Sequence, residues 1–286
     1  MWHLTKIPKV VHFYWGNEKL SYLRYMSVYS FRKLNPDWKI KIHVPGVLSM
    51  IAPTWGSDEQ KNAGIENNYW SKLNNLNVEI VEIPPFNNFD NNAHEVHKSD
   101  YYRWELLCSE GGVWSDIDIV YINPMNNMLE NVPQEKNIDA GFSRYAKKGK
   151  YAIGFILASA GNTFFKKIHE LSNTHYDASK YQSIGSELIN NNWNCPEKLI
   201  KQNPNNIFLL MDEKCVYPII NIPRFFDPMD NKLKAILEDS NVLGLHWFAG
   251  HPKSQQFESA IDESNVDQFD NILSAAIKQI KEYNHV

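Results

Sequence analysis

The feature that most constrains the fold is the alternation of short apolar runs with helical segments over the first half of the chain. The run "KVVHFYW" is typical of a buried first strand, and Gly16-Asn17 closes it. The elements expected here are, in chain order, strand 9–15, helix 19–35, strand 38–44, a segment with helical character at 45–77, strand 77–83 and helix 93–110. Such alternation predicts an α/β fold with a mostly parallel sheet and helices on both faces.

The second half of the chain continues the pattern with helical additions. Strands are expected at 138–143, 151–159, 206–211 and 241–248, and helices near 162–172, 183–192 and 266–283. No repeat or linker interrupts the sequence. We therefore expect a single domain over residues 1–286.

Composition excludes some classes of partner. The 29 basic and 33 acidic side chains give a formal charge of −4, so the basic stripe expected of a nucleic-acid-binding protein is lacking. The 9 Trp, 14 Tyr and 14 Phe suit both a core and a site that stacks rings.

Cysteine use and hydropathy bear on location. Cys108, Cys195 and Cys215 are odd in number and widely spaced, which argues against a disulfide framework and for a reducing compartment. No segment has the apolar length of a signal peptide or membrane span. The expected location is the cytoplasm, with peripheral membrane contact left open.

The stretch "GGVWSDIDIV" (111–120) carries two acids, Asp116 and Asp118, one residue apart. If the stretch is a strand, both carboxylates point to the same face and repel each other unless a cation lies between them. A divalent ion bound to a phosphate meets that need, because Mg²⁺ and Mn²⁺ prefer oxygen ligands. The alternative is an ordinary solvated strand face.

The helix before this stretch contributes further polar groups. In "SDYYRWELL" the residues Asp100, Arg103 and Leu107 fall on one helical stripe. An acid and a guanidinium beside an apolar anchor are costly to bury unless they have partners, which a ligand hydroxyl and a phosphate would supply. The alternative is an intrahelical surface ion pair.

The segment "SDYYRWELLCSEGGVWSDIDIV" resembles the pattern S-D-x-x-R-x-x-x-L-x-x-x-G-G-x-[YW]-x-D-x-D of the glycosyltransferase sugar-binding region with a DXD motif. This is glycosyltransferase family 32, which is similar to the catalytic core of the large clostridial glucosylating toxins. The opening "IPKVVHFYWGN" and the later "NPDW" turn also resemble that family. The resemblance covers residues 7–122 well and the remainder loosely.

The resemblance implies a GT-A fold, a Rossmann-like domain that binds a nucleotide sugar, with 7–122 as the donor half and 123–286 as the acceptor side and C-terminal lid or helix. It implies a nucleotide-sugar donor, Mn²⁺ or Mg²⁺, and retention at the anomeric carbon. The residues that it assigns are Trp15 to the base, Asp100 to sugar hydroxyls, Arg103 to the sugar or phosphate, Trp114 to a usual Tyr position of the donor site, Asp116 to the ribose and the metal, and Asp118 to the metal.

The second half matches the family less well. "LGLHWFAGHPKS" resembles its H-x-x-x-G-S-W element at His246 and Gly250, so His246 is expected at the metal or the diphosphate. His251 and Lys253 are further candidates on a lid, each with an ordinary loop role as the alternative. Gly185 and Glu187 resemble the acceptor side, and "PRFFDPM" (223–229) has no role that we can assign.

Several functions compete at this point. The favoured one is a retaining hexosyltransferase that uses a UDP-sugar, or else a GDP-sugar, with a glycan or lipid-linked oligosaccharide as acceptor. A silent nucleotide-sugar-binding protein is the alternative outside enzymes. A haloacid-dehalogenase-type phosphatase needs a full apolar strand before Asp116, and the Gly-Gly pair leaves no room for it. A pyrophosphorylase should open with a Gly-rich phosphate loop, which "YWGNEKL" is not.

Overall fold

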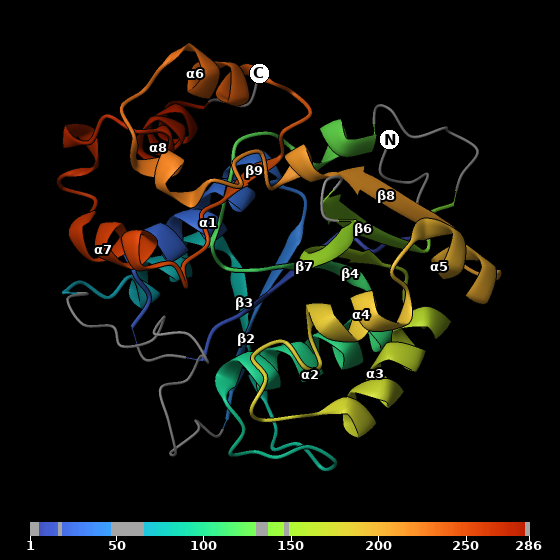
Figure 1. Ribbon diagram of the computed structural model, residues 1–286. Helices are drawn as coiled ribbons and strands as arrows, with labels where there is room; N and C mark the ends of the chain where they lie inside the picture. The colour runs from blue at the N-terminus through green and yellow to red at the C-terminus, as the bar shows by residue number, and fades with distance from the viewer. Residues whose placement is uncertain (1–5, 17–18, 47–65, 130–136, 146–148, 284–286) are drawn as a thin grey trace.

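The computed structural model describes residues 6–16, 19–46, 66–129, 137–145 and 149–283. Within these residues, a seven-stranded sheet has the strand order β3-β2-β1-β4-β7-β6-β8, and β5 pairs with β9 separately (Figure 1). The strands are β1 (Val10–Tyr14), β2 (Lys39–Pro45), β3 (Val78–Ile83), β4 (Gly112–Ser115), β5 (Ile119–Tyr121), β6 (Ala140–Tyr145), β7 (Lys150–Ala158), β8 (Phe208–Asp212) and β9 (Gly244–His246).

Parallel pairing dominates the large sheet. Strands β3, β2, β1 and β4 are parallel neighbours, and β6 is parallel to β8. Strand β7 runs antiparallel between β4 and β6. The predicted α/β class with a mostly parallel central sheet is confirmed, whereas a single domain over 1–286 stays a prediction.

Helices cover both faces of the sheet. Successive side chains of β4 point to opposite faces of the sheet, and Val113 packs in one hydrophobic core whereas Trp114 packs in the other. The first core includes α1 and α8, and the second includes α2, α3 and α4; α2 and α3 lie together beneath the sheet in the view of Figure 1. The α-helices are α1 (Tyr22–Leu34), α2 (Glu95–Ser109), α3 (Thr163–His175), α4 (Ser186–Asn192), α5 (Pro196–Gln202), α6 (Asn231–Glu238), α7 (Pro252–Ala260) and α8 (Ile272–Glu282).

The expected elements are largely present, with differences at the ends and in the C-terminal third. Part of the segment 45–77, residues 47–65, lies outside the described residues, and its described end forms the 3₁₀-helix η3 (Trp70–Leu76). Helices α5, α6 and α7 were not predicted, because the polar residues around them resemble loops. No helix in the described part of the chain has the length and hydropathy that a membrane span needs.

The Gly111-Gly112 pair ends α2 and turns the chain into β4. Both residues have positive φ, 66° and 99°, which L side chains rarely adopt. A Cβ on Gly111 would lie 2.5 Å from the backbone nitrogen of Ala160. Glycine is therefore needed here both for conformation and for space, and the turn sets where α2 and β4 place their side chains.

A buried chain of hydrogen bonds joins β1, β2, α2 and the glycine turn. The Gly111 carbonyl can only accept, so Nε2 of His12 donates to it at 3.0 Å. Nδ1 of His12 then accepts from Nε2 of His43 at 3.0 Å, and Nδ1 of His43 accepts from the Tyr102 hydroxyl at 3.0 Å. Each imidazole in this network is thus neutral, with one defined tautomer.

Candidate active site

A cavity of about 470 Å³ opens where the parallel strands β1 and β4 end. The register pairs His12 with Trp114, so the residues that follow each strand meet at one edge of the sheet. The carboxyl edge of a parallel sheet is where α/β proteins bind ligands. Charged residues lining the cavity are Arg24, Asp100, Arg103, Asp116 and Asp118, together with His246 and His251.

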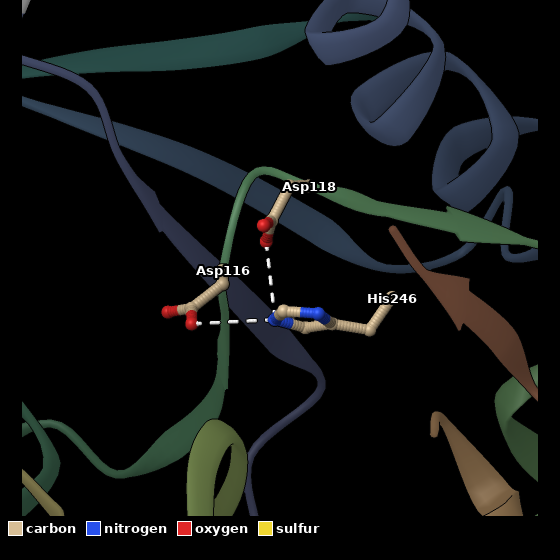
Figure 2. A group of neighbouring side chains, drawn as sticks. All are labelled: Asp116, Asp118 and His246. Carbon is tan, nitrogen blue, oxygen red and sulfur yellow. Dashed lines mark ion pairs between the residues drawn. The ribbon is translucent and has the colours of Figure 1, made fainter. Parts of the chain in front are cut away.

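Asp116, Asp118 and His246 converge on one point of this cavity (Figure 2). One ligand atom from each lies within 4.8 Å of the others, and among the described residues no other such group is found. Nε2 of His246 is 3.3 Å from Oδ1 of Asp118 and 3.8 Å from Oδ2 of Asp116. Two carboxylates and an imidazole form a donor set for a divalent cation.

The two aspartates meet at a turn rather than on a strand. β4 ends at Ser115 and β5 begins at Ile119, so the prediction that both aspartates lie on one strand is wrong. The antiparallel pairing of β5 with β9 places Ile119 opposite His246, which brings the imidazole beside the turn. The amide of Ala249 donates to Oδ2 of Asp118 at 2.9 Å, which directs Oδ1 toward His246.

The space around these three residues fits a bound ion. A Cβ on Gly154, in the neighbouring strand β7, would lie 2.6 Å from Oδ2 of Asp116 and 3.1 Å from Nε2 of His246. Glycine at this position therefore keeps the approach to both donor atoms clear. Hard carboxylate oxygens and one nitrogen suit Mn²⁺ or Mg²⁺.

The charge of Asp116 is stabilised by its neighbours. Burial by itself raises the pKa of Asp116, but Arg103 and then His246 lower it, and the net shift is downward. Oδ1 of Asp116 accepts from the Trp114 indole at 3.0 Å and from Arg103 at 3.2 Å. The carboxylate is thus held ionised and oriented, as a metal ligand requires.

Helix α2 delivers Asp100 and Arg103 to the same cavity. One guanidinium nitrogen of Arg103 is 3.3 Å from Oδ1 of Asp100 and 3.2 Å from Oδ1 of Asp116. Another donates to the Ile153 carbonyl at 2.9 Å, and the group lies 4.6 Å from the centre of the Trp114 ring. The pair is buried, so the surface ion pair considered above is excluded.

Asp100 retains an acceptor that the protein does not use. Its Oδ2 is buried and has no hydrogen-bond partner. Burial raises the pKa of Asp100 to about 7, although Arg103 acts in the opposite direction. Gly185 allows this placement, because a Cβ there would lie 2.3 Å from Oδ2. An orphaned buried oxygen that lines a cavity is suited to a ligand hydroxyl.

Trp15 lies beneath the cavity rather than on its surface. Its side chain is 1% exposed, its indole donates to the Lys19 carbonyl at 3.0 Å, and it is not among the lining residues. The guanidinium of Arg24 lies 4.1 Å above the ring and does line the cavity. The role of Trp15 in base stacking stays a prediction, and in this state Arg24 occupies its face.

Of the remaining predicted site residues, some line the cavity and others do not. His251 lines the cavity, and its Nδ1 accepts from the Lys253 amide at 3.2 Å as the N-cap of α7, so this lid candidate lies at a folded helix terminus. Glu187 lies in the first turn of α4, outside the residues that line the cavity. Residues 223–229 contribute none of the lining side chains.

Some residues at the site were not found from the sequence. Arg24 is a charged residue on the apolar stripe of a helix, a signal that was present but not used. Phe248, whose ring lies 4.4 Å from that of His246, has a φ of 52° that no local pattern announces. Gly154 and Tyr217 meet the site only through the antiparallel strand β7 and the chain before β9.

Residues 24–135 match the family model described as glycosyltransferase sugar-binding region containing DXD motif. The match covers less than half of the 286 residues, so this segment is similar to such a region. The match spans α1, α2 and the DXD turn, so the resemblance drawn from the sequence is confirmed for this part of the chain. A search of curated proteins gave no match.

Three solved structures to which this chain is similar are distant from it in sequence. PaToxG glycosyltransferase is 15% identical with a TM-score of 0.48, over 96% of this chain and 86% of that one. The galactosyltransferase LgtC, in complex with donor and acceptor sugar analogs, is 14% identical with a TM-score of 0.44, over 91% and 100%. GlyE of Streptococcus pneumoniae TIGR4 is 12% identical with a TM-score of 0.47, over 96% and 64%.

Proposed function

We propose that this chain is a metal-dependent, retaining hexosyltransferase that moves a sugar from a UDP-sugar to a hydroxyl of a glycan or lipid-linked oligosaccharide. The convergence of Asp116, Asp118 and His246 within 4.8 Å carries the proposal. The cavity that holds them also presents the buried pair Asp100 and Arg103. Acids for a cation, a guanidinium for phosphate and an unused acceptor for hydroxyls together suit a sugar diphosphate.

Asp116, Asp118 and His246 would hold the ion, with Mn²⁺ preferred over Mg²⁺ because one donor is an imidazole nitrogen. When bound, such an ion supplies positive charge that stabilises a diphosphate leaving group. The protein prepares this site in advance, since Ala249 and Arg103 already orient the two carboxylates.

Donor binding would use the residues around the ion. Oδ2 of Asp100 would accept a hydrogen bond from a sugar hydroxyl, and Arg103 would hold both carboxylates while facing the phosphate. A base would stack on Trp15 once the Arg24 guanidinium has moved from its face. Uridine is favoured over guanosine because the segment "HFYWG" resembles the uridine-using branch of the family.

Retention is proposed by front-face attack. Among the described residues that line the cavity, the carboxylates are Asp100, Asp116 and Asp118. Two of them belong to the cation site, and the third is paired with Arg103 on its Oδ1. None is placed as a separate nucleophile, so the leaving phosphate oxygen would take the proton of the acceptor hydroxyl.

The rival functions fit the site less well. A haloacid-dehalogenase-type phosphatase uses a lysine beside its nucleophile, and the described lining residues include Arg24 and Arg103 but no lysine. A silent binding protein would be expected to have lost part of the site, yet Asp100, Arg103, Asp116 and Asp118 are all in place. Location in the cytoplasm is also part of the proposal, which the three free cysteines support.

Hydrolysis of a panel of UDP- and GDP-sugars with Mn²⁺ tests the function, with release of the nucleoside diphosphate as readout. We expect turnover of at least one donor, its loss in Asp118→Asn, and no change in the matched variant Asp267→Asn, which alters a side chain that is 80% exposed. A donor at 100 times Kd should also raise the free energy of unfolding by about 2.7 kcal/mol. Stabilisation by a donor without any hydrolysis would favour the binding protein, and full activity of Asp118→Asn would overturn the cation site.

A further inference from the structure

A second cavity, which we call the Tyr22–Asp262 cavity, lies between the start of α1 and the chain that leaves α7. Its volume is about 190 Å³. Glu258 lines it, while its ion-pair partner Arg24 lines the central cavity, so this pair is shared by the two walls. The volume is below the roughly 300–1,000 Å³ of sites for larger ligands but exceeds the roughly 30 Å³ share of one water about sixfold.

One buried polar atom in this wall has no hydrogen-bond partner among the described residues. Tyr22 is 2% exposed, and its hydroxyl is buried without a hydrogen bond. Glu258 is also buried, and its Oε1 accepts from the Ser21 hydroxyl at 2.6 Å and from Arg24 at 2.8 Å. The Tyr22 hydroxyl thus has no partner in the described chain, and the carboxylate of Glu258 lies in the same wall.

The carboxylate of Asp262, which also lines the cavity, is held in place by hydrogen bonds. Oδ2 of Asp262 accepts from the Asn67 amide at 2.7 Å and from the Tyr69 hydroxyl at 2.9 Å. Its Oδ1 accepts from the Ser264 amide at 3.1 Å. Both lone pairs of Oδ2 are in use and one of Oδ1 remains, so Asp262 presents one rigid acceptor to a ligand.

The chemistry of the wall excludes two classes of ligand. The carboxylates Glu66, Glu258 and Asp262 line the cavity, and no described Lys or Arg does, which disfavours phosphates and other anions. These carboxylates do not converge as metal ligands do, because the described residues hold only the one such group at Asp116. A neutral ligand with several hydroxyls remains.

Two aromatic rings supply the apolar part of such a site. Tyr22 and Tyr69 lie 5.3 Å apart, tilted by 51°, and both line the cavity. Ring surfaces beside carboxylate and amide groups bind sugars, which combine C–H faces with vicinal hydroxyls. The cavity therefore has the donors, acceptors and size for a single pyranose ring.

We propose that the Tyr22–Asp262 cavity binds one sugar unit of the acceptor glycan, away from the hydroxyl that reacts. This proposal rests on the proposed transferase function and specifies its acceptor as a chain of more than one unit. A hydroxyl bound to the Glu258 carboxylate contacts the group that holds Arg24, whose guanidinium lies 4.1 Å from the Trp15 ring. Acceptor binding in this cavity would thus affect the donor side of the central cavity through the side chain of Arg24.

The test is ligand-observed NMR with the methyl glycosides of glucose, galactose, mannose and N-acetylglucosamine, without metal or nucleotide. We expect at least one glycoside to bind. Tyr22→Phe, which removes only the unpartnered hydroxyl, should weaken that binding about 2- to 10-fold, as the loss of one hydrogen bond predicts. Ala260→Trp fills the cavity from an exposed position on its rim and should abolish binding, whereas Ala160→Trp, in an exposed turn outside it, should not.

The outcomes separate this proposal from the proposed function. Glycoside binding that Ala260→Trp leaves unchanged, or binding of none of the four, would overturn the sugar site. Binding should persist in Asp118→Asn, whose side chain belongs to the central cavity. Binding sensitive to Ala260→Trp in a protein that hydrolyses no donor would keep the sugar site and refute the transferase.

Discussion

The buried pair His12 and His43 is predicted to make the folded protein sensitive to mild acid. Burial is the main cause that lowers the pKa of His12 to about 4 and that of His43 to about 2, from an ordinary 6.5. Charges facing His12 from its surroundings, Glu110, Lys41 and Glu79, oppose one another in sign. Both imidazoles stay neutral in the folded state at any pH above 5.

The magnitude follows from proton linkage. Between pH 6.5 and the folded pKa values, the unfolded chain binds a proton at each histidine that the folded chain does not, so stability is complete above pH 6.5 and is lost as the pH falls. One pKa unit corresponds to about 1.4 kcal/mol, so lowering the pH from 7.5 to 5.5 removes about that amount for each residue. His12 and His43 together should remove about 2.7 kcal/mol.

Urea denaturation followed by tryptophan fluorescence, at pH 7.5, 6.5 and 5.5 with EDTA, measures this loss. The quantity to compare is the change in unfolding free energy with pH, wild type against the double variant His12→Gln/His43→Gln, because the substitutions also alter stability at every pH. The variant should lack the loss of about 2.7 kcal/mol. His175→Gln removes an exposed histidine outside the network and serves as the control, with a wild-type profile expected.

The pH profile of the variant has to be subtracted from that of the wild type, because Asp100 changes the free energy of unfolding with pH in the opposite direction to the histidines. Its folded pKa of about 7 lies above the ordinary 3.8, so its contribution to stability grows as the pH falls through 7. A wild-type profile alone would show the histidine and aspartate effects partly cancelled. Parallel profiles for wild type and the double histidine variant would refute the burial argument for His12 and His43.

Three further outcomes are expected. Gly111→Ala should lower the free energy of unfolding, measured in urea, by more than about 2 kcal/mol, because strain at positive φ adds to a 2.5 Å approach of the new Cβ to backbone. In the control Gly161→Ala, φ is 69° but nothing lies within 4 Å of the new Cβ, so the loss should be about 1 kcal/mol. Equal losses in the two variants would contradict this prediction. Gly154→Ala should weaken Mn²⁺ binding, measured by electron paramagnetic resonance, at least about tenfold by crowding the donor atoms, and unchanged affinity would argue against the cation site. Asp100→Asn should abolish donor hydrolysis and remove the loss of stability of about 2.3 kcal/mol between pH 5 and 7 that the raised pKa predicts. Retained hydrolysis would refute its role at the donor.

The donor half could be predicted because its information is local. Strand periodicity, the glycine stop after α2 and the stripe of Asp100 and Arg103 each depend on residues within a few turns of one another. The parallel strands β1 and β4 then bring the residues after them to one edge without further information. This explains why Asp116 and Asp118 could be expected beside Asp100 and Arg103 even though the turn itself was predicted as a strand.

The rest of the site depends on contacts between distant segments. Gly154 reaches Asp116 only because β7 enters the sheet antiparallel beside β4, and no residue of β7 signals that direction. Arg24 meets Glu258 across more than two hundred residues. Pairing at such separations depends on the packing of the whole chain, which local propensity does not encode.

The pairing of β5 with β9 has a consequence for biosynthesis. Both aspartates of the DXD turn are made long before His246 and Ala249, which complete the cluster and orient Asp118. A growing chain with only the first half folded would therefore carry two carboxylates without the imidazole, and ordered loop closure over that distance is a late event. Tight uptake of Mn²⁺ would thus report that β9 has paired with β5, which makes the ion a check on the folding of purified material before any donor is added.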